Sequence, residues 1–265
     1  MLMKTKTVVI FGASGAIGSE TARVLAREGA HVFLVARNRD KLERVANDIR
    51  SAGGIAESRV IDVFDERSVL EQTAKMAQQT GGIDVVVNAT GFMHEQGKHL
   101  AELSLAEFRQ GFDPFLTALF TISKAVVPYM GGDREGVIIT VVAPAGPMAI
   151  PGHLGHIVGC AGIEAFVNAL ASELGPKNIR VTGVRSHAIS GAVQAGSYTG
   201  ELFAIKAQSM GVTIEQFMEG AAQSTMLKRL PTLPQVAGVI AFLASEHARA
   251  MTATMVNVTA GATLG

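Results

Sequence analysis

Two histidines and the only cysteine of the chain occur close together in the stretch HLGHIVGCAG, which runs from His153 to Gly162. In a helix, residues three and four positions apart share a face, so His153, His156 and Cys160 would point the same way. Imidazole and thiol groups on one face could bind a metal, pair as base and nucleophile, or serve in general acid–base catalysis. The elements that hold this stretch decide which chemistry is available.

The composition describes a globular chain with a large core. Of 265 residues, 48% are apolar and 17% charged, and the 23 Lys and Arg balance the 23 Asp and Glu. No basic stripe or polybasic segment is present, so we expect neither a nucleic-acid partner nor a membrane partner. A single cysteine cannot form an internal disulfide, which favours the cytoplasm. We expect no secretory segment at the N-terminus and no spanning helix, because no apolar run reaches the roughly 18 residues that one needs.

Short runs rich in Val and Ile alternate with longer segments of helical period, which is typical of parallel strands joined by helices. This alternation predicts a single α/β domain over residues 1–265, with a Rossmann-like, doubly wound sheet of seven parallel strands and helices on both faces. Residues 190–229 fall outside the rhythm and are expected to form a small helical flap over the carboxyl ends of the strands. The predicted strands are 7–11, 31–36, 57–63, 83–89, 136–142, 179–184 and 254–259.

A glycine-rich loop, GASGAIG, follows the first predicted strand and opens a helix. Gly12, Gly15 and Gly18 would allow a tight turn and a close approach of a pyrophosphate to the free N–H groups of that helix. The second strand ends in VARNR, where no carboxylate is placed to bind a ribose 2′-hydroxyl. Arg37 suits a 2′-phosphate instead, so we expect NADP(H) in preference to NAD(H).

With these features the whole chain resembles the short-chain dehydrogenase/reductase family. Besides the glycine loop, IDVF (61–64) is similar to the segment that contacts adenine, and NATG (88–91) stands where the family has Asn-Asn-Ala-Gly beside the ribose. The resemblance implies hydride transfer between a nicotinamide and a small-molecule substrate. The residues expected to bind the cofactor are Gly12, Ser14, Gly15, Ile17, Gly18, Arg37, Asn38, Asp62, Val63, Asn88, Ala89 and Gly91.

The catalytic set of the family is not present at the matching positions. The family uses Tyr as acid/base, Lys four residues later, Ser on a strand end and Asn in the preceding helix. Here the Tyr and Lys positions hold His156 and Cys160, and the Ser and Asn positions hold Ala143 and Phe115. The Pro-Gly pair beside the nicotinamide becomes Ser186-His187. The resemblance therefore implies an atypical member.

Three hypotheses for the altered set stay open. In the first, His156 replaces Tyr as general acid, because its ordinary pKa near 6.5 needs no Lys to tune it, and His153, Ser186 or His187 supplies the lost donor. In the second, the protein binds NADP(H) without redox turnover, as a sensor, a partner subunit or the enzyme of a redox-neutral step. In the third, His153, His156 and Cys160 bind a metal, with a spacing that matches no zinc signature.

Several side chains have two interpretations at this point. Cys160 is either a nucleophile activated by His156 or a small buried thiol that fills the place of a lysine. His94 belongs either to the pocket wall or to the solvent, and Asp113 is expected on the flank of its helix, ahead of a break imposed by Pro114. The resemblance also implies a homo-dimer or homo-tetramer, paired through long helices near 105–130 and 151–174 and through the final strand.

Overall fold

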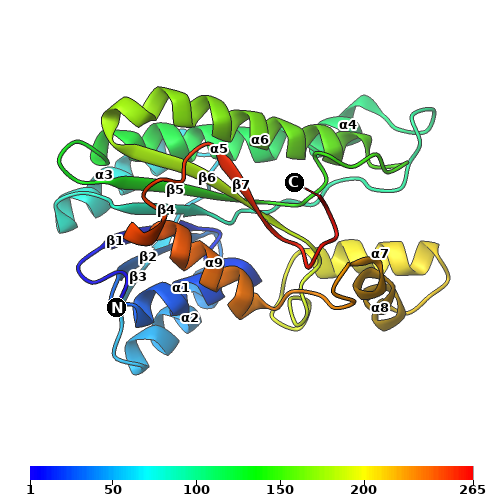
Figure 1. The fold of residues 1–265 in the computed structure, drawn as a ribbon, viewed down its shortest axis with the longest axis horizontal. Coiled ribbons are helices and arrows are strands. Elements are labelled where there is room, and N and C mark those ends of the chain that lie inside the picture. The colour runs from blue at the N-terminus through cyan, green and yellow to red at the C-terminus, as the bar shows by residue number, and fades with distance from the viewer. Residues whose placement is uncertain (265) are drawn as a thin grey trace.

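The computed structural model describes residues 1–264. They form one sheet of seven parallel strands with helices on both faces (Figure 1). The strand order is β3-β2-β1-β4-β5-β6-β7. Strands β2 and β3 are added on one side of β1 and strands β4 to β7 on the other, as in doubly wound folds. The predicted fold class is confirmed. The strands are β1 (Thr7–Phe11), β2 (His31–Ala36), β3 (Ile55–Val60), β4 (Val85–Asn88), β5 (Gly136–Val142), β6 (Ile179–Ser186) and β7 (Thr254–Val258).

Some strand boundaries differ from those expected. The third strand covers Ile55–Val60 rather than 57–63, because Asp62 begins a turn in which its Oδ1 accepts a hydrogen bond from the Phe64 amide, at 3.1 Å. The fourth strand is shorter than 83–89, the sixth continues to Ser186, and the seventh stops at Val258. The carboxyl ends of β4, β5 and β6 lie side by side because these three strands are neighbours and parallel in the sheet.

Helices cover both faces of the sheet, and each layer encloses a separate apolar core. On one face lie α1 (Ala16–Arg27), α2 (Arg39–Ser51) and α9 (Leu233–Ala244). On the other lie α3 (Glu66–Thr80), α5 (Asp113–Val126) and α6 (Leu154–Leu174), with α4 (Leu105–Gln110) against α6. Short 3₁₀ turns are η1 (Val127–Tyr129), η2 (Gly175–Lys177) and η3 (Glu246–Ala248).

The segment between β6 and α9 forms two further helices, α7 (Thr199–Ser209) and α8 (Ile214–Ser224). They stand beyond the carboxyl ends of the strands, to the right in Figure 1, and pack against each other. We call residues 190–229 the flap. It adds a wall to the end of the sheet at which folds of this class bind ligands.

The expected helix over 105–130 is broken into α4, α5 and η1. The break lies at Gly111 and Phe112, just before Asp113 and Pro114 begin α5. There α6 comes so close that a β-carbon on Gly159 would lie 2.1 Å from the Gly111 carbonyl oxygen. Glycine in α6 thus permits a backbone contact that fixes the amino-terminal half of α6 over the sheet.

By length and composition alone, helix α6 is the one described helix that could cross a membrane, a test that core helices of globular proteins also pass. The segment Leu154–Lys177 includes Glu164 and Glu173, so it is not an uninterrupted apolar run. Here the helix packs against β6, α4 and α5. Only a third of its most apolar part is buried (33%), so α6 also presents an apolar face that this chain does not cover.

Candidate functional site

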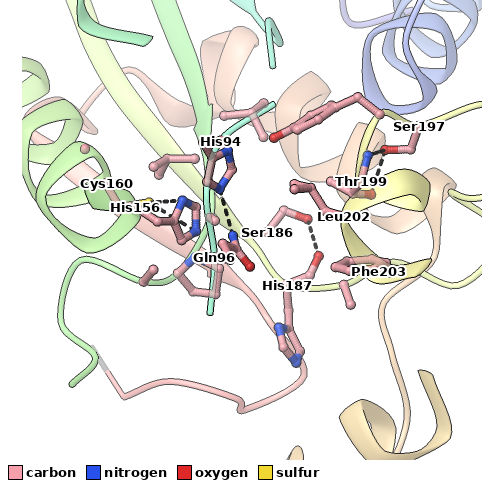
Figure 2. A pocket seen from close by; sticks show the side chains of 18 of the residues that line it. His94, Gln96, His156, Cys160, Ser186, His187, Ser197, Thr199, Leu202 and Phe203 are labelled. Atoms are coloured by element: carbon pink, nitrogen blue, oxygen red, sulfur yellow. Dashed lines mark hydrogen bonds between the residues drawn. The ribbon is translucent and has the colours of Figure 1, made fainter. Parts of the chain in front are cut away.

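A cavity of about 280 Å³ lies at the carboxyl ends of β4, β5 and β6, between α6 and the flap (Figure 2). Its wall is mainly apolar, and it extends from Ile17 next to the glycine loop to Phe217 of α8. All four positions of the altered catalytic set line it, together with both residues of the altered Pro-Gly pair: Phe115, Ala143, His156, Cys160, Ser186 and His187.

The glycine loop has the geometry of a phosphate cradle. Gly12 adopts a φ of +79°, and a β-carbon there would lie 2.4 Å from the Ala89 carbonyl oxygen. Gly15 is the N-cap of α1 and has no side chain to occupy the free N–H groups of the first turn. Such a terminus favours an anion. The residues present therefore fit the pyrophosphate of a dinucleotide.

The expected partners of the adenosine half lie at the ends of the next two strands. Arg37 follows β2 and is exposed, as is Arg39 at the start of α2. The Asn38 side chain caps α2 by accepting a hydrogen bond from the Lys41 amide, at 2.9 Å. Beyond β3, Asp62 is exposed and Val63 is buried. The strand ends thus present a guanidinium and a carboxylate to one side of the glycine loop.

The segment after β4 borders both the loop and the cavity. Asn88 is buried, and its Oδ1 accepts hydrogen bonds from the Thr90 amide at 3.1 Å and from the Thr90 hydroxyl at 2.7 Å. This pairing fixes the turn that carries Ala89 and Gly91. The Tyr198 ring of the flap lies directly against Gly91, since a β-carbon there would be 2.0 Å from its Cε1. Tyr198 lines the cavity and was not singled out by the sequence.

His156 stacks on His94 in the cavity wall, with ring centroids 4.4 Å apart and planes 13° from parallel (Figure 2). The Phe92 carbonyl can only accept, so His94 Nδ1 carries the hydrogen that bonds it at 2.9 Å. His94 Nε2 then accepts from the Gln96 amide, at 2.7 Å. His94 is therefore a wall residue, held as the neutral tautomer that supports the His156 ring.

Burial, and then repulsion by Lys206 and by His94 and His153 in their protonated forms, lowers the pKa of His156 to about 3. The ring is neutral at pH 7, so an ordinary histidine pKa near 6.5 cannot be its source of acidity. Within residues 1–264 its ring has only the Cys160 sulfur as a hydrogen-bond partner, at 3.9 Å from Nδ1 and 3.8 Å from Nε2. A ligand can thus receive its N–H.

Cys160 behaves as a buried thiol. The side chain is 4% exposed, and burial raises the pKa of the thiol to about 12. Its sulfur lies nearly equally far from both nitrogens of His156, so it is aligned with neither. A thiolate nucleophile needs a lowered pKa, and this environment has the opposite effect. The geometry favours the packing role.

His153 belongs to a different arrangement from His156 and Cys160. It is the N-cap of α6, and its Nδ1 lies 2.8 Å from the Pro151 carbonyl oxygen. Its Nε2 lies 2.6 Å from the Nζ atom of Lys206 in α7. With both ring nitrogens occupied, it does not converge with the other two. Over residues 1–264 no group of three or more His, Cys, Asp or Glu has the arrangement of a metal site.

Of the other expected residues, Ser186 and His187 line the cavity, whereas Asp113 does not. Ser186 ends β6, and its hydroxyl donates to the His187 carbonyl oxygen at 3.3 Å. His187 Nε2 is buried and has no partner within the described residues, and burial lowers the pKa of the ring. Asp113 is exposed beside Arg109, at 3.7 Å, and does not line the cavity.

Comparison with known proteins decides the family. Residues 12–263 match the family model described as enoyl-(acyl carrier protein) reductase. The chain is 32% identical over 260 residues to 2,3-dihydro-2,3-dihydroxybenzoate dehydrogenase of Bacillus subtilis (strain 168), covering 98% of this chain and 97% of that protein. The chain belongs to the short-chain dehydrogenase/reductase family. It is also 26% identical over 266 residues to a 3-oxoacyl-[acyl-carrier-protein] reductase of Thermotoga maritima, covering 98% and 99% of the two chains.

Solved structures have the same fold. A short-chain dehydrogenase/reductase of Brucella melitensis superposes with a TM-score of 0.83 at 26% identity, covering 100% of this chain and 99% of that one. An NAD⁺-bound xylitol dehydrogenase has a TM-score of 0.88 at 24% identity, covering 98% and 100%. Family membership supports a nicotinamide-binding oxidoreductase fold for this short-chain dehydrogenase/reductase.

The flap adds residues that motif analysis missed. Tyr198 and Lys206 enter the cavity from a segment that carries no motif of the family. Tyrosine and lysine are the residue types that the family has where α6 carries His156 and Cys160. The sequence indicated these two residues only indirectly, through the polar segment between β6 and α9. Spacing alone cannot show which side chains of that segment turn inward.

Proposed function

We propose that the protein is an NADP(H)-dependent oxidoreductase acting on a small molecule, with His156 in place of the family's tyrosine. One observation carries this proposal: the neutral His156 ring lies in the cavity, with an N–H free to bind a ligand. A histidine held neutral by a lowered pKa can polarise a carbonyl by donating that hydrogen. His156 then acts as a hydrogen-bond donor, which differs from the cationic acid expected from an ordinary pKa.

The glycine loop and the strand ends would hold the cofactor. Gly12, Gly15 and Gly18 would receive the pyrophosphate, and Asp62 and Val63 the adenine. Arg37 would pair with a 2′-phosphate, since it is exposed beside the loop and lacks a carboxylate neighbour at the end of β2. When bound, NADPH would supply a hydride to the carbon of a polarised double bond, and the other atom of that bond would take its proton from the His156 N–H, which solvent restores. Asn88 fixes the turn beside the ribose through Thr90.

The chain's own residues prepare that bond for reduction. His94 holds the His156 ring by stacking, and Gln96 fixes the His94 tautomer. The apolar wall excludes water, which strengthens each hydrogen bond made inside the cavity. Ala143 offers no hydroxyl where the family has serine, so a substrate oxygen depends on His156 and on the residues beside it. C=C and C=N bonds depend less than ketones on the missing serine.

The function is tested by NADPH consumption with ketones, enones and imines, compared between wild type and His156→Ala. The expected loss of turnover is roughly 100-fold, because the variant removes the donor to the developing charge. Cys160→Ala is the matched variant from the next turn of α6 and should stay within a few-fold of wild type. Turnover unchanged by His156→Ala would remove His156 from the mechanism.

A second function keeps the cofactor but not the redox step. All four catalytic positions of the family are altered, and this observation favours a cofactor-binding protein that is a sensor, a partner subunit or the enzyme of a redox-neutral step. The same panel separates the two functions. NADPH binding with no consumption by any substrate class would favour the second.

We also propose that the protein is a homo-dimer or homo-tetramer located in the cytoplasm. The uncovered face of α6 includes Val158, which is 41% exposed, and neighbouring α5 exposes 54% of Phe120. Exposed apolar side chains on two neighbouring helices are typical of an interface. The single cysteine supports a reducing compartment.

The oligomer is tested by replacing Val158 with arginine and measuring sedimentation. Wild type should sediment as a dimer or tetramer of the 27.7 kDa chain, and Val158→Arg should shift it toward the monomer. Leu70→Arg, at a position 38% exposed on α3, is the matched control. A wild-type monomer would reject the proposal.

A further inference from the structure

Lys206 of α7 is a basic side chain in the cavity wall, and the proposed cofactor binding gives it no role. Among the described residues that line the cavity, it is the only Lys, Arg, Asp or Glu. Its Nζ atom has one polar partner, His153 Nε2 at 2.6 Å. Burial lowers the pKa of the amine, and no carboxylate raises it. The cavity thus holds a cation that the described part of the chain leaves without a counter-charge.

The partner of Lys206 is an acceptor and not an acid. The Pro151 carbonyl fixes the hydrogen of His153 on Nδ1, so Nε2 presents a lone pair to the lysine. This bond orients the amine toward α6 and uses one of the three N–H bonds of an ammonium. Two donors remain beside an apolar wall. Lys206 is partly buried, and an ammonium that has lost part of its hydration is stabilised by a paired anion.

We propose that Lys206 binds the carboxylate of a substrate whose remaining part is apolar. A carboxylate would accept the remaining N–H bonds in charge-assisted hydrogen bonds and supply the missing counter-charge. The single cation and the absence of arginine favour one negative charge rather than a phosphate. Phe115, Phe203 and Phe217 line the same cavity and would pack against the apolar part.

Lys206 and His156 could hold one substrate at two points. Lys206 extends from the flap and His156 from α6, and both line the same cavity. A molecule whose carboxylate meets Lys206 would then present its reactive bond toward His156. This last point rests on the proposed function, whereas carboxylate binding does not, so the test measures binding without turnover.

The experiment is isothermal titration of the full chain with benzoate, and separately with benzamide, which has the same ring and no charge. Wild type is expected to bind benzoate roughly tenfold or more tightly than benzamide. Lys206→Met should remove that preference while leaving benzamide binding within about twofold, and Lys206→Arg should restore most of it. Lys75→Met, at an exposed site on α3, removes the same charge away from the cavity and should behave as wild type.

Three outcomes would overturn the inference: equal affinity of wild type for the two probes, unchanged benzoate affinity in Lys206→Met, and binding of neither probe. Circular dichroism at the titration temperature establishes that each variant is folded. NADPH is titrated in a separate cell. Its failure to bind would count against the proposed function and would leave the benzoate comparison intact.

Discussion

Replacing Gly18 with alanine is expected to lower the affinity for NADPH by more than roughly 100-fold. The added β-carbon would lie 2.3 Å from the Gly12 carbonyl oxygen and 2.9 Å from its carbon, both in the backbone of the loop. No side-chain rotation can relieve this overlap, so the loop must move away from α1. That movement removes the aligned N–H groups on which pyrophosphate binding depends.

The matched control is Gly238→Ala in α9, because a β-carbon there meets no atom within 4 Å. Alanine in place of an interior helical glycine should raise the free energy of unfolding by about 0.5–1 kcal/mol and leave NADPH binding unchanged. Fluorescence titration and thermal unfolding of both variants make the comparison. A folded Gly18→Ala protein that binds NADPH as wild type does would contradict the role of the loop.

The second large effect concerns acid stability. His156, His94, His153 and His187 are all buried enough that their pKa values are lowered, that of His156 to about 3. In the unfolded chain a histidine takes up a proton near pH 6.5, whereas the folded form resists it. Each such group therefore stabilises the fold fully above pH 6.5 and loses that contribution as the pH falls toward the folded pKa.

The free energy of unfolding should fall by about 1.4 kcal/mol per pH unit for every histidine protonated only in the unfolded chain. Urea denaturation at pH 7, 6 and 5, at one protein concentration, measures the slope. His156→Gln should reduce the slope by about one proton. Equal stability at pH 7 and pH 5 would show that these rings are not held neutral.

The sheet was predictable from the sequence because its strands are continuous apolar runs. Val8, Val9 and Ile10 are fully buried, and both faces of such a strand must be covered. The break between α4 and α5 was also signalled locally, because Pro114 lies in the first turn of α5. The close approach of α6 to that break at Gly159 was not predictable in the same way, because Gly159 is distant in sequence and only near in space.

The functional site also combines features that local sequence predicts with features that depend on distant residues. The glycine loop and the positions of His156 and Cys160 follow from local motifs, and the structure places them at one cavity. Spacing alone put His153 on their face, but its place at the start of α6 turns it toward Lys206. The low pKa of His156 arises mainly from burial, and His94 after β4 and Lys206 of the flap lower it further, which no spacing rule contains.

The most direct test of the account is a fluorescence titration of the purified protein with NADPH and, separately, with NADH. Micromolar binding with NADPH preferred is expected, and Arg37→Ala should lose that preference. Binding of neither nucleotide would contradict it, because the glycine loop would then be a structural remnant and His156 would have no hydride donor to serve.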